Sequence, residues 1–320
     1  MHRRKFIEVA GMGMAGSLIS GSVSGEIAGA ADFDAAWFHR ARRYARTPMG
    51  RIAYVEGGKG PAALFLHGFP LNSFQWRGAL ARLSPHRRCI APDFLALGYT
   101  ETPETQSVGP EAQVAMLVAL LDELSVTEVD LVASDSGGAI AQLLVARDPK
   151  RVRTLLLTNC DTEIDSPPPA FLPVIKMSKA GTFVDQSFLP QLADKSFARS
   201  AQGLGGQCYF DPAHPTDEAV EYYLAPLAST PLRKAQTHAY AVALEKNPLA
   251  GIEPALKRCR VPTRIVWGMG DTIFSPKSPD YLDHIFSNSR GVRRLEGSKL
   301  FWPEELPDVV AEEARKLWAV

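Results

Sequence analysis

Three short motifs follow apolar runs of the chain and carry side chains that could do chemistry. In the segment 129–139 an apolar stretch turns at Asp135 and continues into Gly137 and Gly138. A strand that turns sharply into a helix is typical of a nucleophile elbow, which pushes the side chain at its tip into a cleft. Because the tip residue is an aspartate, this motif predicts an alkyl-ester intermediate rather than an acyl-enzyme.

The register of this motif favours Asp135 over Ser136 as the nucleophile. With Asp135 at the tip, Ala133, Gly137 and Gly138 occupy the positions where a tight turn needs small residues. With Ser136 at the tip, the junction between strand and helix would move by one residue. The alternative that Asp135 is a plain helix N-cap stays open.

The other two motifs follow two further apolar runs. The segment 67–70 reads His-Gly-Phe-Pro, and Asp271 comes shortly after the run 263–267. We expect the backbone N–H groups of Phe69 and Ser136 to point at a developing negative charge. Ligand sites in open α/β sheets lie at the carboxyl ends of the strands, so all three motifs are expected at one edge of a sheet.

The elements that must position these motifs alternate between strand and helix. The expected strands are 38–46, 51–56, 62–66, 88–91, 129–134, 152–158, 263–267 and 292–295, and the expected helices are 73–83, 111–124, 137–147 and 304–318. This alternation predicts an α/β fold with a mostly parallel, doubly wound sheet. Residues 161–254 are mostly helical in pattern, which predicts a helical cap inserted between core segments 31–160 and 255–320.

In order and spacing, the motifs resemble the α/β-hydrolase superfamily across roughly residues 36–320. The resemblance rests on the His-Gly-Phe-Pro segment followed by Trp76, on the Asp-x-Gly-Gly elbow, and on the segment 267–271. It is closest to the branch with aspartate nucleophiles, the epoxide hydrolases and haloalkane dehalogenases. It implies that Asp135 attacks a carbon bearing a leaving group, and that a histidine oriented by Asp271 then activates water.

The chain departs from this family at the histidine. The segment 297–305 fits the expected last loop without a gap, but Leu300 stands in the histidine position. Leucine cannot take a proton, so an ester on Asp135 would be hydrolysed slowly. Asp161, just after the strand 152–158, is another candidate acid.

The remaining histidines are more simply explained by structural roles. His67 is expected to brace nearby backbone, His284 to lie on the surface, and His214 to lie in the cap. His238 is the cap histidine that could face the cleft, although a structural role is favoured for it as well.

Other departures narrow the substrate. By resemblance, dehalogenases hold halide with a tryptophan where Ser136 stands and often an asparagine where Phe69 stands, and fluoroacetate-type relatives have an arginine at the position of Ser136. Their absence disfavours dehalogenation. Epoxide hydrolases activate the ring oxygen with cap tyrosines. The candidates for this role are Tyr222 and Tyr223, with Tyr209 and Tyr240 also available. The candidates for the substrate-binding wall of the cleft are Trp76, Tyr222, Tyr223 and His238.

Composition excludes several classes of protein. The chain has 35 basic and 35 acidic residues without long charged blocks, which argues against a nucleic-acid partner or a charged membrane surface. The four cysteines lack the paired spacing of a zinc site and are expected to be small core hydrophobes rather than disulfides. We expect no metal and no cofactor.

The first residues predict export. Arg3 and Arg4, a weakly apolar Gly-rich stretch and the small residues near Ala30 are typical of a twin-arginine signal over 1–30. The export machinery would then deliver the protein to the periplasm or the medium, without stable membrane insertion after cleavage.

The leading interpretation is an exported hydrolase of the epoxide-hydrolase-like type that acts on a small, apolar molecule through Asp135. Two alternatives remain because Leu300 replaces the histidine. Asp135 could serve as a base or charge stabiliser in a lyase, isomerase or cyclase, or the protein could be a catalytically silent binding protein.

Overall fold

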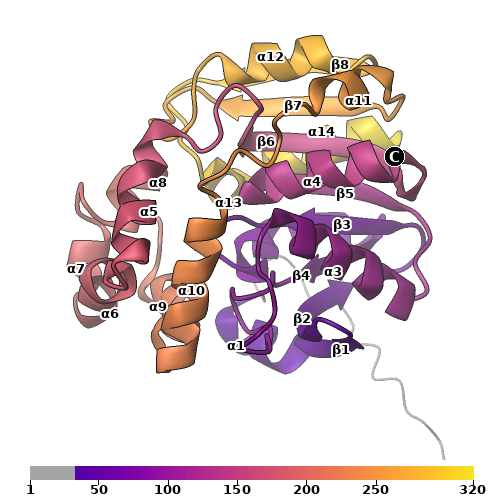
Figure 1. Ribbon diagram of the computed structural model, residues 1–320. Coiled ribbons are helices and arrows are strands. Elements are labelled where there is room, and N and C mark those ends of the chain that lie inside the picture. Colours follow the sequence, from indigo (N-terminus) through magenta and orange to yellow (C-terminus); the bar gives the residue numbers. More distant parts are fainter. Residues whose placement is uncertain (1–32) are drawn as a thin grey trace, which may run out of the picture.

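A single mixed sheet organises the computed structural model, which describes residues 33–320 (Figure 1). The signal segment expected over 1–30 lies outside the described residues. Within them the strands are β1 (Arg43–Thr47), β2 (Gly50–Gly57), β3 (Ala62–Leu66), β4 (Arg88–Pro92), β5 (Val129–Asp135), β6 (Val152–Cys160), β7 (Thr263–Gly268) and β8 (Ser289–Leu295). Their order is β1-β2-β4-β3-β5-β6-β7-β8.

The sheet is parallel from β4 to β8, and β1 and β2 are antiparallel additions at one edge. The predicted α/β class with a mostly parallel sheet is therefore confirmed. The central strands β3 and β5 are buried at every position, which explains why their sequences are continuous apolar runs rather than alternating ones.

Helices cover both faces of the sheet. Around the core they are α1 (Ala35–Ala41), η1 (Ser73–Trp76), α2 (Arg77–Leu83), α3 (Pro110–Glu123), α4 (Ser136–Arg147), η2 (Pro149–Arg151), α11 (Glu253–Arg258), α12 (Ser278–Ile285), α13 (Trp302–Glu305) and α14 (Pro307–Trp318). Helices α3 and α4 pack against each other on one face, and α2 and α14 pack against each other on the other (Figure 1).

The prediction of a first strand over 38–46 is wrong in its first half. Residues Ala35–Ala41 form helix α1, and β1 begins only at Arg43. The helix starts because the Asp34 carboxylate accepts a hydrogen bond of 2.7 Å from the Trp37 N–H. It is held in place because Phe38 is fully buried. A capped turn with one buried aromatic side chain outweighs the strand preference of its neighbours.

Between β6 and β7 every named element of the described chain is helical. These elements are η3 (Pro169–Phe171), α5 (Leu172–Lys179), the π-helical η4 (Val184–Phe188), α6 (Leu189–Ala193), α7 (Lys195–Ala198), α8 (Leu204–Cys208), α9 (Asp217–Ala228) and α10 (Pro231–Ala243), before α11. Figure 1 shows α5 to α10 grouped beyond the carboxyl ends of the parallel strands. We refer to residues 161–252 as the helical segment.

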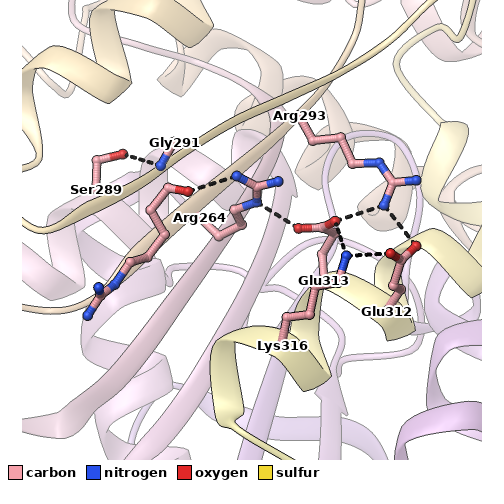
Figure 2. A network of polar contacts seen from close by, with 8 residues as sticks. Arg264, Ser289, Gly291, Arg293, Glu312, Glu313 and Lys316 are labelled. Atoms are coloured by element: carbon pink, nitrogen blue, oxygen red, sulfur yellow. Dashed lines mark hydrogen bonds and ion pairs between the residues drawn. The ribbon is translucent and has the colours of Figure 1, made fainter.

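A network of ion pairs fixes α14 to the last two strands (Figure 2). Glu313 of α14 is buried and accepts hydrogen bonds of 2.7 Å from Arg264 of β7 and from Arg293 of β8. Arg293 also pairs with Glu312, which in turn pairs with Lys316. The network thereby holds β7, whose carboxyl end leads directly to Asp271, in a fixed position.

Two further observations concern the described residues as a set. All four cysteines are buried and free, as expected of small core hydrophobes. Among the helices that the structure describes, none combines the length and apolar character needed to cross a membrane.

Candidate active site

Asp135 lies at the tip of a strained turn between β5 and α4. Its backbone has φ 55° and ψ −138°, a sparsely populated positive-φ conformation that costs a non-glycine residue about 1–3 kcal/mol. The turn is possible because the helix begins with glycines. A Cβ atom on Gly137 would lie 2.2 Å from the His67 carbonyl oxygen, and one on Gly138 would lie 2.3 Å from the Cβ of Cys160. This turn has the geometry that the sequence predicts for a nucleophile elbow.

The loop after β3 approaches Asp135 from the neighbouring strand. Gly68 makes this approach possible, because a Cβ atom there would lie 2.2 Å from both the Cβ and Oδ2 atoms of Asp135. The buried His67 ring braces the loop: Nδ1 lies 2.9 Å from the Gly68 carbonyl oxygen, and Nε2 accepts a hydrogen bond of 3.1 Å from the Phe94 N–H. The structural role expected for His67 is therefore confirmed.

The Asp135 carboxyl group is buried among like charges. Only 7 % of the residue is exposed, and its Oδ2 atom has no hydrogen-bond partner. Burial raises the pKa of Asp135 well above its ordinary value, and the carboxylates of Asp161 and Asp271 raise this pKa further. The backbone N–H groups of Ser136 and Phe69 face the carboxyl group and act in the opposite direction, since they favour its charged form.

Asp135 lines a cavity of about 330 Å³ between the sheet and the helical segment. We call it the large cavity. Its wall is mostly apolar and includes Phe69, Phe171, Met177, Phe183, Phe188 and Leu300. A cavity of this size and character fits a small apolar molecule, with the carboxyl group as its charged feature.

Leu300 lies where the family resemblance expects a histidine. It is 3 % exposed and belongs to the wall of the large cavity, together with Asp135. It therefore shares a cavity wall with Asp135, but its side chain is an alkyl group. Among the described residues, no histidine lines the large cavity.

His238, His214 and His284 lie outside the lining of the large cavity. His238 accepts a hydrogen bond of 3.1 Å at Nε2 from the Val184 N–H, so it ties two parts of the helical segment together. His214 stacks on Tyr209, and His284 is exposed on α12. The structure therefore does not bring His238 to the cleft wall.

Asp271 is held by other groups in place of a histidine. Its Oδ2 atom accepts a hydrogen bond of 2.8 Å from the Asn159 side chain, and its Oδ1 atom accepts one of 2.8 Å from the Ile273 N–H. Burial raises the pKa of Asp271 to about 6. Asn159 also accepts a hydrogen bond of 3.1 Å from the Trp302 indole. Sequence reasoning missed Asn159, because an amide at the end of a buried strand carries no motif.

Asp161 forms the second carboxyl group beside Asp135. It follows β6, is 4 % exposed, and accepts a hydrogen bond of 2.9 Å at Oδ1 from the Ser166 hydroxyl. Burial raises the pKa of Asp161 to about 7. Asp161 and Asp135 both line a second cavity of about 20 Å³, which we call the small cavity.

Trp76, Tyr222 and Tyr223 do not line either cavity that contains Asp135, contrary to expectation. Trp76 is fully buried in the core. The Tyr222 ring stacks on Phe74, 4.6 Å between centroids. The Tyr223 hydroxyl donates a hydrogen bond of 2.6 Å to Glu304. Tyr222 and Tyr223 face these partners because the docking of α9 against the core fixes the direction of their side chains. The sequence pattern does not specify this docking.

Tyr240 is the tyrosine that comes nearest to the elbow. Its hydroxyl lies 3.0 Å from the Ser136 hydroxyl, and its ring stacks on Phe69 with 5.7 Å between centroids. In the sequence Tyr240 is one of several cap tyrosines, and nothing in the pattern distinguishes it from the others. Tyr240 therefore contacts Phe69 and Ser136, the two residues whose N–H groups face the Asp135 carboxyl group.

Comparisons with known proteins agree with this fold. The profile of the family described as "alpha/beta hydrolase fold" matches residues 61–300. Haloalkane dehalogenase 2 of Mycobacterium tuberculosis (strain ATCC 25618 / H37Rv) is 25 % identical over 301 residues, which cover 87 % of this chain and 93 % of that protein.

Two further matches differ in the chemistry that their names state. A cis-3-alkyl-4-alkyloxetan-2-one decarboxylase of Shewanella oneidensis is 28 % identical over 242 residues, 70 % of this chain and 71 % of that protein. The solved structure of the epoxide hydrolase CorEH without ligand superposes with a TM-score of 0.73 at 20 % identity, covering 87 % of this chain and 98 % of that one. The structural likeness supports the shared fold.

Proposed function

This chain belongs to the alpha/beta hydrolase fold family, and we propose that it hydrolyses a small apolar molecule through a covalent ester on Asp135. The observation that carries the proposal is the Asp135 carboxyl group itself. It is 7 % exposed, its Oδ2 atom lacks a partner, and it lies on the wall of the apolar large cavity. A carboxylate shielded from water in this way is available to an electrophilic carbon of a bound ligand.

The proposed reaction has two halves. An oxygen of Asp135 bonds to a carbon of the ligand, the bond from that carbon to its leaving oxygen breaks, and the leaving oxygen takes a proton from water. Water then attacks the ester carbonyl carbon, and the N–H groups of Phe69 and Ser136 stabilise the resulting oxyanion.

We favour an epoxide over an alkyl halide as the electrophile. Among the described residues that line the large cavity there is no tryptophan, so no indole N–H is available there to stabilise a departing halide. No tyrosine is among these lining residues either, so the preference for an epoxide rests on the strain of its ring and on its oxygen staying attached to the product.

Intact-mass analysis with and without Asp135→Asn tests the proposal. The protein is incubated with a panel of epoxides and alkyl halides, and both the adduct mass and the released product are followed. An adduct or turnover that the wild type shows and Asp135→Asn lacks supports an ester on Asp135. Neither adduct nor turnover on any member of the panel would reject it, and retained ligand binding would then favour a silent binding protein.

Leu300 and the decarboxylase relative favour a second candidate, a non-hydrolytic reaction in which Asp135 acts as a base or charge stabiliser. Such a reaction needs no histidine to activate water. Reactions run in water labelled with heavy oxygen separate the two candidates. Hydrolysis transfers the label to the product or to the Asp135 carboxyl group, whereas an elimination or decarboxylation leaves both unlabelled.

We also propose that the protein is exported through the twin-arginine machinery. Arg3 and Arg4 precede a weakly apolar stretch and small residues near Ala30. Replacing both arginines by lysine is expected to retain the full-length protein in the cytoplasm, as measured by cell fractionation and the mass of the N-terminal peptide. Unchanged processing and location in that variant would reject export by this route.

A further inference from the structure

We propose that Asp161 activates the hydrolytic water in this site, from a position different from that of the family's histidine. The inference rests on the proposed function, because it concerns the second half of the Asp135 ester reaction. It assigns a catalytic role to a carboxyl group that the resemblance would use only to orient a histidine.

The small cavity is the observation that leads to Asp161. Its volume of about 20 Å³ matches the space that one water molecule needs, roughly 10–15 Å³ of probe volume or more. A buried water also needs about two to four polar partners. The small cavity offers the carboxyl groups of Asp135 and Asp161 together with Ser136, and the rest of its wall is apolar.

The two cavities meet at Asp135 from different directions. Asp135, Phe69, Phe171 and Ile273 line both cavities, but Asp161 lines the small cavity alone. A ligand in the large cavity would therefore leave the small cavity to water. The Asp135 Oδ2 atom is buried and has no hydrogen-bond partner, so a water bound beside Asp135 could supply one.

The step is balanced in atoms and charge. The Asp161 carboxylate takes a proton from water as the water oxygen bonds to the Asp135 carbonyl carbon. The bond from that carbon to the ligand oxygen then breaks. The ligand oxygen takes the second proton of the attacking water, which the carboxyl group of Asp135 would otherwise keep. The products are the alcohol, ionised Asp135 and protonated Asp161.

The electrostatic interaction between the Asp135 and Asp161 carboxyl groups favours ester formation on Asp135 followed by proton transfer to Asp161. The charge of Asp161 raises the pKa of Asp135, so the two carboxyl groups disfavour each other's ionisation. Esterification removes the Asp135 carboxyl group from this pair, so Asp161 is the member of the pair that still titrates. Burial raises the pKa of Asp161 to about 7, which makes it a stronger base than an exposed carboxylate near neutral pH.

Several other groups face Asp161. The charge of Asp165 raises the pKa of Asp161, whereas the Ser166 hydroxyl lowers it through a hydrogen bond. The charge of Asp161 in turn raises the pKa values of Tyr240 on α10 and of Cys160. None of the groups that shift the pKa of Asp161 is a cation.

Asp161→Asn separates the two halves of the reaction. Styrene oxide is the probe, and quenched mass spectra give the rates at which the adduct forms and decays. We expect decay to slow by about 100-fold or more, the usual contribution of a general base. Formation is expected to stay equal or to rise, because the loss of a like charge favours ionised Asp135. A merely structural role would slow both steps.

Asp165→Asn is the matched control. Asp165 lies four residues along the chain, is buried, and accepts a hydrogen bond of 2.5 Å from the Ser275 N–H, but it does not line the small cavity. Because the charge of Asp165 raises the pKa of Asp161, we expect the midpoint of the pH profile of adduct decay to fall in this variant, while its formation rate and its decay rate above that midpoint stay close to those of the wild type. An equal slowing of decay in both variants would overturn the role of Asp161.

The pH profile of the wild type gives a second test that needs no variant. Adduct decay should fall about tenfold per pH unit below a pKa near 7, because only ionised Asp161 accepts the proton. Decay that is independent of pH between 5 and 8, or unchanged by Asp161→Asn, would overturn the inference while leaving the ester intact. The absence of any adduct or diol from the wild type would instead reject the proposed function, and this inference with it.

Discussion

Gly68→Ala tests whether the close approach of the loop after β3 positions the Asp135 carboxyl group. The new Cβ atom would lie 2.2 Å from the Cβ and Oδ2 atoms of Asp135 and 2.4 Å from its Cγ atom. These distances are far below ordinary van der Waals contact, so the loop or the carboxyl group has to shift. The loop is not free to do so, because the His67 ring bonds to backbone on both sides.

The expected cost follows from this overlap. Overpacking a rigid core typically costs about 1–3 kcal/mol, which corresponds to a fall in melting temperature of roughly 2–4 °C per kcal/mol for a domain of this order of size. The shift of the carboxyl group has a larger effect on chemistry, since a displacement of about 1 Å can slow a reaction about 100-fold. We therefore expect a modest loss of stability and a large loss of ester formation.

The assay pairs a thermal melt with the rate of adduct formation from styrene oxide. Gly109→Ala is the control, because a Cβ atom there would meet its nearest neighbour, the Cβ of Ala243, at an ordinary distance of 3.6 Å. Its φ of −68° also suits alanine. If Gly68→Ala melts like the wild type and forms the adduct as fast, the idea that this contact sets the position of Asp135 is refuted.

Two further predictions concern the carboxyl groups. Asp161 has a folded-state pKa of about 7 against an ordinary value of 3.8, so the folded state binds more protons and loses stability as pH rises between these values. Asp161→Asn should therefore raise the free energy of unfolding at pH 8 but not at pH 4, which urea denaturation at both pH values measures. Leu300→His in the Asp161→Asn background should speed adduct decay about 100-fold, since an imidazole beside Asp271 could activate water; unchanged decay would mean that position 300 does not reach the ester.

The sequence predicted most of the core because parallel strands buried on both faces leave continuous apolar runs. The expected strand 62–66 coincides with β3 (Ala62–Leu66), and the elbow of Asp135 lies between β5 and α4 as expected. The turn was predictable because its tight backbone requires small residues directly after the tip, and Gly137 and Gly138 meet this requirement within the same short segment. Helix α1 was missed because its stability depends on one cap and on Phe38, which packs against residues distant in sequence.

The parts of the site that sequence reasoning missed depend on non-local packing. The side chain of Tyr222 could face the cleft or the core, and only the docking of α9 against Phe74 decides between them. Asn159 takes up the carboxyl oxygen of Asp271 that a histidine would otherwise use. The small cavity lined by Asp135 and Asp161 likewise arises from five separate parts of the chain and has no signature in any one of them.

A leucine at position 300 does not by itself imply that the site is inert. Asp135 sits in a positive-φ backbone conformation, and burial and like charges raise the pKa values of Asp135, Asp161 and Asp271 together. None of the groups that shift the pKa of Asp135 is a cation. Each buried carboxyl group therefore destabilises the folded protein as pH rises, and an amide of the same shape would not. Strain and unpaired buried acids at one cavity are typical of sites where chemistry, rather than stability, decides which residues are present.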